Sequence, residues 1–400
     1  MKTLIATFAL AFLCLPAGVG ASELDDIPPE VARVSDSLKR AYAPDSRVAL
    51  FDVDYTFSGK DVMLRGVTTS GEAKRALTGC LVAGGYRVMD FLKVLPDSAG
   101  LQGKTYGIIN LSVASMRREA DYSSEMVTQA LLGMPVRVLQ HNGWYRIQTP
   151  DNYIAWVHRA SVCPVTREEL SAWNRAEKVV VTSHYGFVYS RPDRRAQTVS
   201  DVVAGDRLKL EGRYGAFYRV AYPDGRKGYL LKADAVPEEK WRAGLKQEAD
   251  DIIATAHTLM GVPYLWAGTS SKGMDCSGFV RTVLFMHDII IPRDASQQAY
   301  VGQHIDIAPD FGNLQPGDLL FFGRKAAPGR KERIVHVGIY IGGKRFIHSQ
   351  GDVRLSSFAP ADSCFDEYNL GRLLFATRIL PYIDKEEGLN TTATNPYYRL

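Results

Sequence analysis

A cysteine and two histidines in the last third of the chain carry the strongest chemical signal. Cys276 opens a pattern of apolar residues at helical spacing, which predicts a helix over 276–286. Partial positive charge at the start of a helix stabilises a thiolate, the nucleophilic form of cysteine. Such a nucleophile needs a base to hold its proton and a third group to orient that base. The sequence therefore predicts a cysteine nucleophile whose partners come from other elements.

The predicted partners are His336 and His348, which stand on consecutive strand-like runs. The Gly-Gly-Lys segment over 342–344 suits a three-residue hairpin loop, in which one residue adopts a left-handed conformation. That loop pairs His348 with Gly338, so the two histidines share a face at about 7 Å or less. A two-residue loop would pair His348 with Val337 and put the two histidines on opposite faces. The spacing thus permits a Cys–His–His triad.

The elements that position these residues belong to a chain of 400 residues, of which 46% are hydrophobic and 23% charged. This ordinary globular composition excludes a disordered or collagen-like protein. The formal charge of +4 gives no electrostatic footprint for nucleic acid, so no nucleic-acid partner is expected. At about 150 residues per domain, the length predicts two to four folded units.

Residues 1–21 have the pattern of a secretory signal peptide. Lys2 precedes an apolar run over 4–15, and small residues follow that run. The run is shorter than the roughly 20 residues needed to span a bilayer, so no stable membrane insertion is expected. A lipoprotein anchor at Cys14 is disfavoured, because Leu13 stands where a small residue should precede the lipidated cysteine. The chain is therefore expected to be exported to a periplasm or cell surface.

The next unit, residues 22–105, has no obvious chemistry. Strand-like alternation over 47–57, 61–69 and 86–95 surrounds a helical stretch over 72–81. This mixed order predicts a small α+β unit.

An internal repeat follows at an offset of 73 residues. The run Trp-Tyr-Arg-Ile over 144–147 matches Phe-Tyr-Arg-Val over 217–220, and each copy continues through a Pro-Asp turn into a second strand. Short strands and tight turns predict two small closed barrels, over 106–165 and 166–238. Their pattern resembles the SH3-like domains found on bacterial cell-wall enzymes.

The last unit, residues 239–382, places helical spacing around the cysteine and strand-like runs after it. Helices followed by antiparallel strands are typical of an α+β domain. A tail over 383–400 completes the chain. The predicted fold class is therefore multidomain α+β, with a small N-terminal α+β unit, two SH3-like β-barrels and a papain-like α+β catalytic domain.

Five motifs in a fixed order over about residues 245–380 resemble the NlpC family, papain-like cysteine peptidases that cut peptidoglycan stem peptides. The motifs are Tyr264-x-Trp266-x-Gly268, Asp275-Cys276-Ser277-Gly278-Phe279, Gln315-Pro316-Gly317-Asp318-Leu319, His336-Val337-Gly338-Ile339-Tyr340-Ile341-Gly342 and the later His348. The resemblance implies that Cys276 is the nucleophile, His336 the general base and His348 the orienting residue. Tyr264 matches the tyrosine that forms the oxyanion hole with the Cys276 backbone N–H. No metal or organic cofactor is implied, and zinc binding by the cysteine and two histidines is the weaker interpretation.

A signal peptide, two SH3-like domains and this catalytic unit together resemble a narrower group, the γ-D-glutamyl-L-diamino-acid endopeptidases, also called dipeptidyl-peptidase VI. These enzymes require a free N-terminal L-Ala, and an acid and a tyrosine of the first barrel close the site around the amine. Tyr153 matches the barrel tyrosine, and Glu125 is preferred over Glu119 as the acid. The substrate-binding residues that this resemblance implies are Asp275, Ser277, Trp266, Tyr153 and Glu125.

The expected function is hydrolysis of the γ-D-Glu–diamino-acid bond in peptidoglycan-derived peptides, in recycling or turnover. Two alternatives stay open: an endopeptidase that remodels intact peptidoglycan, and a non-catalytic protein that binds the cell wall through its barrels. The sequence leaves open the choice between meso-diaminopimelate and lysine, the disulfide pairing, the oligomeric state and the role of residues 22–105.

Overall fold

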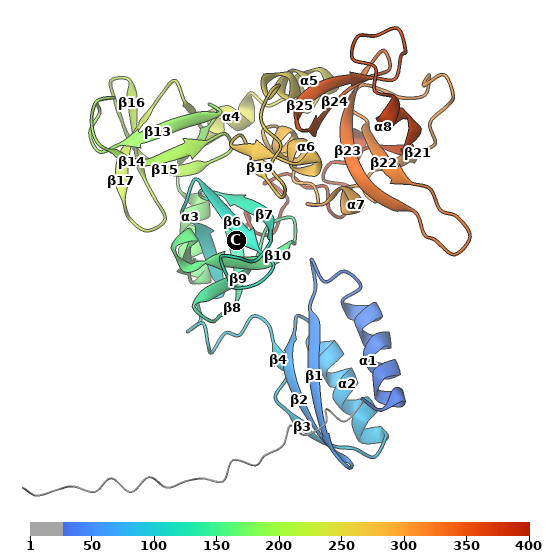
Figure 1. Cartoon of the computed structure of the whole chain (residues 1–400). Helices are drawn as coiled ribbons and strands as arrows, with labels where there is room; N and C mark the ends of the chain where they lie inside the picture. The colour runs from blue at the N-terminus through green and yellow to red at the C-terminus, as the bar shows by residue number, and fades with distance from the viewer. Residues whose placement is uncertain (1–26) are drawn as a thin grey trace, which may run out of the picture.

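The computed structural model describes residues 27–400 and shows four parts in chain order (Figure 1). The N-terminal unit, drawn in blue, extends away from the two barrels and the C-terminal unit. The predicted signal peptide over 1–21 lies outside the described residues. Within residues 27–400, no helix is long and apolar enough to cross a membrane.

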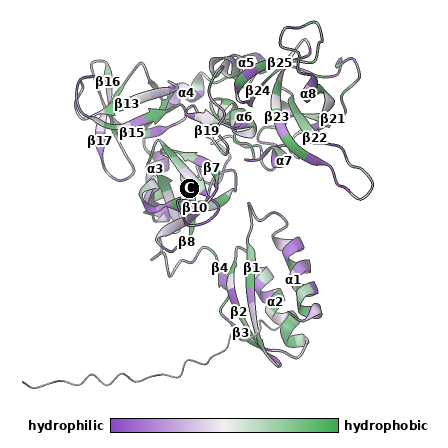
Figure 2. Cartoon of the chain, in the orientation of Figure 1, coloured by the Kyte–Doolittle hydropathy of each residue, from purple (hydrophilic) through white to green (hydrophobic). Residues whose placement is uncertain are grey.

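The N-terminal unit packs two helices against a four-stranded sheet. Its elements are α1 (Pro29–Tyr42), β1 (Phe51–Ser58), β2 (Asp61–Thr68), α2 (Gly71–Ala83), β3 (Arg87–Asp90) and β4 (Lys93–Val94). β1 pairs antiparallel with β2, whereas β3 and β4 each pair parallel with β2. Buried Leu64 and Leu77 join the sheet to α2. Both helices carry hydrophilic and hydrophobic residues, as helices packed on one side of a sheet do (Figure 2).

Two details of this unit differ from the sequence interpretation. The sequence interpretation assigns no helix to residues 29–42, yet α1 forms there. Pro29 suits the first position of this helix, because a backbone N–H at a helix start has no partner within the helix and proline lacks that N–H. The run predicted as one strand over 86–95 forms two short strands. They are separated where the Asp90 carboxylate accepts a hydrogen bond from the Leu92 N–H at 3.0 Å.

The first barrel is a seven-stranded antiparallel sheet with the order β11-β5-β8-β9-β10-β6-β7. Its elements are β5 (Tyr106–Ile109), β6 (Val113–Arg117), β7 (Met126–Leu131), β8 (Pro135–His141), β9 (Trp144–Gln148), β10 (Ile154–His158), the short helix η1 (Arg159–Ser161) and β11 (Val162–Val165). Its interior holds small and branched apolar side chains, including fully buried Ala114, Val136 and Ile147.

The second barrel repeats this plan with the strand order β14-β13-β17-β16-β15-β12-β18. After α3 (Arg167–Arg175) come β12 (Lys178–Val181), β13 (Tyr185–Tyr189), β14 (Thr198–Val203), β15 (Arg207–Tyr214), β16 (Phe217–Ala221), β17 (Lys227–Leu231) and β18 (Ala235–Pro237). The repeat in sequence corresponds to equivalent hairpins. Ile147 pairs with Ala155 in the first barrel, and Val220 pairs with Gly228 in the second, 73 positions later in each strand.

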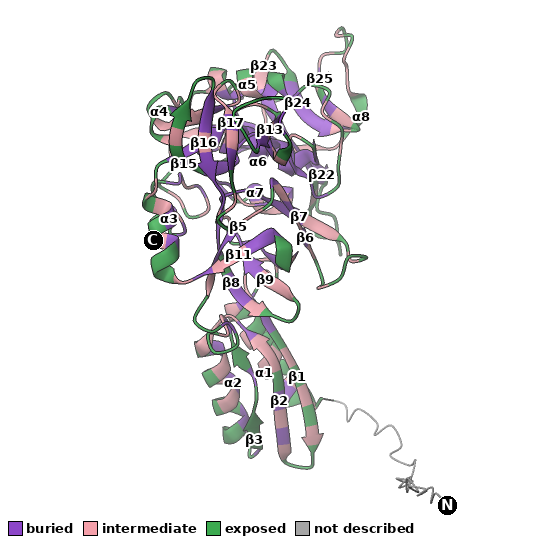
Figure 3. Cartoon of the chain, turned by 90° about the vertical axis from the view of Figure 1, so that its left-hand side faces the viewer, coloured by how far each residue is buried: buried purple, intermediate pink, exposed green. Residues whose placement is uncertain are grey.

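The C-terminal unit places helices on a six-stranded antiparallel sheet with the order β21-β26-β22-β23-β24-β25. Its elements are α4 (Glu238–Ala243), α5 (Ala249–Thr258), β19 (Thr269–Ser270), β20 (Gly273–Met274), α6 (Cys276–Phe285), α7 (Ala295–Gln298), β21 (Gln303–Ile305), β22 (Leu319–Arg324), β23 (Arg333–Gly342), β24 (Arg345–Gln350), β25 (Asp352–Ser357), α8 (Glu367–Gly371), β26 (Leu373–Arg378) and η2 (Leu380–Tyr382). Every residue of α6 is buried, and the helix packs against β23 and β24 (Figure 3). The core therefore lies between α6 and the sheet.

Segments from the other parts hold the C-terminal unit against the first barrel. Arg47 of the N-terminal unit pairs with Asp294 at 2.7 Å, and its backbone oxygen accepts from the Ile154 N–H of the barrel at 2.7 Å. Asn395, in the final segment, donates to the Pro150 carbonyl at 2.9 Å. The first barrel therefore contacts both the N-terminal unit and the final segment of the chain.

Candidate active site

The loop before α6 is shaped by a helix cap and by two glycines. Asp275 Oδ1 accepts from the Gly278 N–H at 2.7 Å, which satisfies one of the free N–H groups at the helix start. A Cβ on Gly278 would lie 1.9 Å from the Gly268 carbonyl oxygen, and a Cβ on Gly268 would lie 2.3 Å from the Gly273 oxygen. Only glycine fits at positions 268 and 278, and this close packing places Cys276 at the first residue of α6.

The Cys276 side chain lies largely buried under this loop, with 8% of the residue exposed. Burial raises the pKa of its thiol, and the charge of Asp275 raises that pKa further. Backbone groups of Val337 and Ser277 lower it, so the sulfur lies beside the strand that carries His336. The resting group is therefore the thiol, and its attack on a carbonyl requires a base to take the proton.

The two histidines meet across β23 and β24. Ile339 pairs with Ile347, which sets His348 opposite Gly338, as the sequence interpretation predicts. His336 Nε2 and His348 Nδ1 lie 2.7 Å apart, in hydrogen-bond contact. The two rings therefore share one face of the sheet.

The hairpin loop differs from the prediction. Gly342 pairs with Arg345, so the loop has two residues rather than three, and a bulge at Ile341 takes up the remaining one. Gly343 and Lys344 have φ angles of 58° and 63°, as a two-residue loop of type I′ requires. The bulge restores the register that brings the histidines to the same face.

Burial keeps both histidines neutral around pH 7. It lowers the pKa of His336 well below its usual range, and His348 and Arg372 lower that pKa further. Burial also lowers the pKa of His348, to about 4. Within residues 27–400, His336 Nδ1 makes no hydrogen bond, to Cys276 or to any other group, so transfer of the thiol proton to this nitrogen stays a prediction.

These shifts predict a pH profile. If His336 acts as a base, its neutral form is the active one and is present above its pKa. Because that pKa lies below the ordinary value of about 6.5, hydrolysis should persist below pH 6.5 and fall only as the pH passes the lowered value. The acidic limb of kcat/KM against pH measures this. A limb centred at or above pH 6.5 would contradict it.

Tyr264 lies near Cys276, on the loop that precedes α6. Burial raises the pKa of its hydroxyl, and the charges of Cys276 and Asp275 raise it further. Its backbone N–H donates to the Gly351 carbonyl at 2.9 Å, which fixes the residue against the turn before β25. The hydroxyl therefore stays protonated and can donate to an oxyanion.

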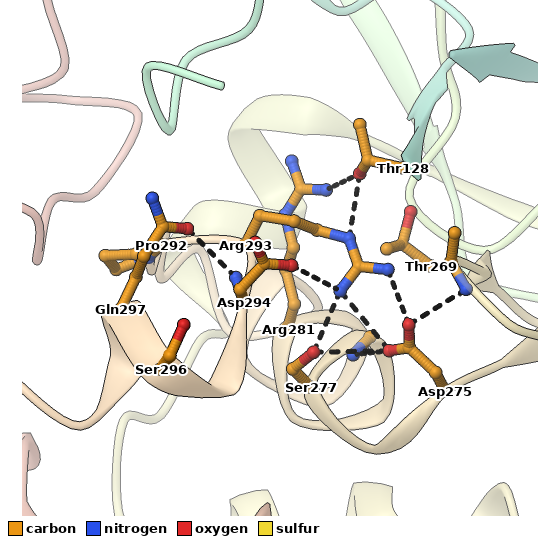
Figure 4. A network of polar contacts seen from close by, with 12 residues as sticks. Thr128, Thr269, Asp275, Ser277, Arg281, Pro292, Arg293, Asp294, Ser296 and Gln297 are labelled. Carbon is orange, nitrogen blue, oxygen red and sulfur yellow. Dashed lines mark hydrogen bonds and ion pairs between the residues drawn. The ribbon is translucent and has the colours of Figure 1, made fainter. Parts of the chain in front are cut away.

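Arg293 links the start of α6 to the first barrel (Figure 4). It is 1% exposed and donates to Asp275 Oδ2 at 2.7 Å, to Ser277 Oγ at 2.8 Å and to Thr128 Oγ1 at 2.9 Å. Sequence reasoning missed this residue. The available signal was a charged residue soon after an apolar run over 289–291, where a lone charge needs partners if it is buried.

The Asp275 carboxylate is surrounded by protein donors. Oδ2 accepts from the Ala267 N–H at 2.9 Å and from Arg293, while Oδ1 accepts from the Gly278 N–H and from the Ser277 hydroxyl at 3.3 Å. A carboxylate offers about four lone-pair sites, and these contacts use them. The structure therefore gives Asp275 a capping and ion-pairing role, and its contact with a substrate amine stays a prediction.

The first barrel reaches the catalytic loop through Glu125. Its Oε1 accepts from Trp266 Nε1 at 3.0 Å, and its Oε2 accepts from Arg118 at 2.6 Å. Trp266 is 62% exposed and the Glu125 side chain is 42% exposed. This carboxylate thus lies at the accessible edge of the site, where a ligand can reach it.

Tyr153 lies at a second junction between the first barrel and the catalytic unit. It is buried, and burial raises the pKa of its hydroxyl. The charge of Asp294 raises that pKa, while Arg293 and Arg47 lower it, so the phenol faces the start of α7. Arg293 therefore faces both Tyr153 and Asp275, two residues predicted to bind substrate.

No metal-binding cluster of three or more His, Cys, Asp or Glu side chains occurs within residues 27–400. The cysteines in this part of the chain, all of them free thiols, are Cys80, Cys163, Cys276 and Cys364.

Known protein families match both the first barrel and the C-terminal unit. The NlpC/P60 family matches residues 261–371, and the bacterial dipeptidyl-peptidase SH3 domain matches residues 116–162. A γ-D-glutamyl-L-lysine dipeptidyl-peptidase of Bacillus cereus is 33% identical over 250 residues, which cover 60% of this chain and 72% of that protein. The chain belongs to the NlpC/P60 family. It is a cysteine peptidase of that family.

Further relatives are similar to this NlpC/P60 peptidase. A γ-D-glutamyl-L-lysine dipeptidyl-peptidase of Bacillus subtilis is 29% identical, over 56% of this chain and 71% of that protein. The crystal structure of an NlpC/P60 family protein from Bacillus cereus aligns with a TM-score of 0.57 at 26% identity, covering 69% of this chain and 100% of that one. An NlpC/P60 endopeptidase of Photobacterium damselae shares the fold, with a TM-score of 0.52 at 14% identity over 70% of this chain and 72% of that one.

Proposed function

We propose that this NlpC/P60 peptidase is exported to a periplasm or cell surface and hydrolyses the bond between γ-D-Glu and the diamino acid of peptidoglycan stem peptides. Its substrate carries a free N-terminal L-Ala. The proposal rests on the contact between Glu125 of the first barrel and Trp266 of the catalytic loop, which brings a carboxylate to the edge of the site. The names of the two Bacillus relatives, γ-D-glutamyl-L-lysine dipeptidyl-peptidases, support the same bond.

In the proposed reaction, His336 Nδ1 takes the proton of Cys276 while Sγ attacks the γ-carbonyl carbon of D-Glu. The electron pair of the C=O bond moves to oxygen, and the Tyr264 hydroxyl and the Cys276 backbone N–H stabilise the oxyanion. His336 then gives its proton to the amine of the diamino acid as the C–N bond breaks. Water hydrolyses the resulting thioester, which releases L-Ala-D-Glu and restores the thiol.

Recognition of the amine follows from charge. An ammonium that leaves water needs carboxylate partners, and a blocked N-terminus lacks the charge that would attract them. Glu125 is the accessible carboxylate in this arrangement. Tyr153 and Asp275 are buried next to Arg293, so they would support the amine-binding site rather than contact the amine through free oxygens. The first barrel would then set specificity, in addition to linking the domains.

Two matched peptides test the proposal, L-Ala-γ-D-Glu-L-Lys with a free amine and its N-acetyl form, each also made with meso-diaminopimelate. We expect kcat/KM to favour the free peptides by roughly 10- to 150-fold, the range for a hydrogen bond to a charged group. Equal cleavage would remove the amine-binding part and favour an endopeptidase of intact peptidoglycan. No cleavage of either, with co-sedimentation on sacculi, would favour the cell-wall-binding alternative.

A matched pair of variants locates the amine-binding group in the same assay. Glu125→Gln should lower kcat/KM on the free peptide by roughly tenfold or more and leave the acetylated peptide unaffected. Glu119→Gln is the control, because Glu119 lies in the same barrel and makes no hydrogen bond through its side chain within residues 27–400. An equal loss in both variants would point to general charge rather than to a specific contact.

A further inference from the structure

A chain of polar contacts continues from the histidine pair to Asp366, the residue that caps the start of α8. His348 Nε2 lies 3.0 Å from Ser356 Oγ on β25, and the Ser356 hydroxyl donates to Asp366 Oδ2 at 3.1 Å. With the 2.7 Å contact between His336 and His348, four side chains form an unbroken series. Ser356 is 5% exposed, and both of its contacts are direct.

The end of the series is an ionised carboxylate. Burial raises the pKa of Asp366, but donors from Asn369 and Ser356 outweigh burial and hold it below the usual range. The Asn369 backbone N–H donates to Asp366 Oδ1 at 2.9 Å, and Asn369 Nδ2 donates to Oδ2 at 2.5 Å. A carboxylate in this state only accepts hydrogen bonds. The single hydroxyl proton of Ser356 must therefore point to Asp366.

This direction determines the tautomers of both histidines. Because the Ser356 proton is used on Asp366, its oxygen accepts from His348, which places a proton on His348 Nε2. His348 Nδ1 then has only a lone pair and accepts from His336 Nε2–H across 2.7 Å. The remaining nitrogen, His336 Nδ1, is left with a lone pair. This is the nitrogen that a base must offer to the Cys276 thiol.

We propose that Ser356 and Asp366 are positioning residues that set the tautomers of both histidines and so leave His336 Nδ1 free to take the proton of Cys276. This inference rests on the proposed catalytic roles of Cys276 and His336. In the step, one proton moves from Sγ to Nδ1, the sulfur becomes a thiolate and His336 becomes a cation. His348 stays neutral, and Ser356 and Asp366 keep their protonation states.

Asp366 also supplies charge to a site that otherwise disfavours a cation. His348 is faced by Arg354 and Arg372, whose charges lower its pKa, and by Asp352 and Asp366, whose charges raise it. Asp366 Oδ2 is 3.9 Å from His348 Nε2. This carboxylate therefore offsets part of the cost of forming the His336 cation beside buried groups.

The main test is Asp366→Asn, which keeps the shape and replaces an acceptor with a possible donor. If the amide donates to Ser356, the hydroxyl must donate to His348 Nε2, and the proton moves onto His336 Nδ1. We expect kcat to fall roughly 10- to 100-fold with KM changed less than about twofold. This is smaller than the 10⁴-fold loss known when the residue in direct contact with the base is changed. Nitrogen-15 NMR of the histidines should show the tautomers exchanged.

A second pair of variants keeps the test independent of folding. Ser356→Ala should lower kcat similarly, while Ser356→Thr keeps the hydroxyl and should restore most of the activity. The neighbouring residue on β25 provides the matched control, because Ser357 Oγ donates to Asp362 Oδ2 at 2.7 Å and does not contact the histidines. Ser357→Ala and Asp362→Asn should leave the histidine tautomers unchanged. Equal spectra and equal kcat in Asp366→Asn and Asp362→Asn would overturn the inference.

Alkylation of Cys276 by iodoacetamide separates this inference from the proposed substrate. The reaction needs the thiol and its base but no peptide, so it reports proton transfer alone. We expect Asp366→Asn to slow alkylation near pH 7 by roughly tenfold. Slower alkylation would support the role of Ser356 and Asp366 in setting the histidine tautomers, even if no γ-D-Glu peptide is cleaved. An unchanged alkylation rate would overturn that role, even if the peptides are cleaved as proposed.

Discussion

Replacing Cys276 with alanine should abolish hydrolysis of the L-Ala-γ-D-Glu peptides, with kcat lowered by about 10⁴-fold or more. Alanine has no atom that can form the thioester, and neither histidine can substitute for it because both rings are held in the sheet. The variant should still fold, because Cys276 is the first residue of α6 and alanine suits a helix. Dipeptide release measured by mass spectrometry, together with thermal unfolding, checks both statements.

His336→Ala provides the comparison for that variant. Residues that act as a unit lose similar activity when changed singly, so His336→Ala should approach the loss of Cys276→Ala rather than add to it. The double variant should be no slower than Cys276→Ala alone. Substantial hydrolysis by Cys276→Ala would mean that another group performs the attack, and the proposed chemistry would fail.

The positions of Cys276 at a helix start and of His336 and His348 on one face of a hairpin could be predicted, because each arrangement is local. Cys276 and Gly278 lie within one turn of a helix, and their spacing follows from the cap formed by Asp275. His336 and His348 lie on one hairpin, where alternation of side chains allows few registers. The predicted loop length is wrong, yet the pairing of His348 with Gly338 is right, because the bulge beside the loop compensates for it.

The supporting residues could not be predicted, because their partners lie far away along the chain. Arg293 donates to Thr128, 165 positions earlier, through an interface between two domains. Asp366 meets His348 only after β25 and the following loop turn back toward the sheet. No periodic pattern marks such contacts, since they depend on the packing of whole units. The same reason applies to Glu125 and Trp266, which only the resemblance to a family could connect.

The largest effect on stability is expected at Arg293. Its guanidinium is 1% exposed and neutralises the Asp275 carboxylate, so Arg293→Met would leave a buried negative charge without its cation. Removing one partner of a buried ion pair costs about 3–5 kcal/mol. We therefore expect the free energy of unfolding of the catalytic unit to fall by about that amount, as measured by urea denaturation followed by fluorescence.

Two further variants show whether the charge itself is responsible. Asp275→Asn keeps an oxygen that can cap α6, so Asp275→Asn combined with Arg293→Met removes both charges while the helix start is preserved. We expect the double variant to be less destabilised than the sum of the single variants, with a coupling of about 0.5–3 kcal/mol. Arg87→Met is the exposed control, because its pair with Asp61 lies at the surface, is screened by solvent and should contribute little to stability. Additive losses at Arg293 and Asp275 would show that packing, rather than the ion pair, holds the nucleophile's helix against the first barrel.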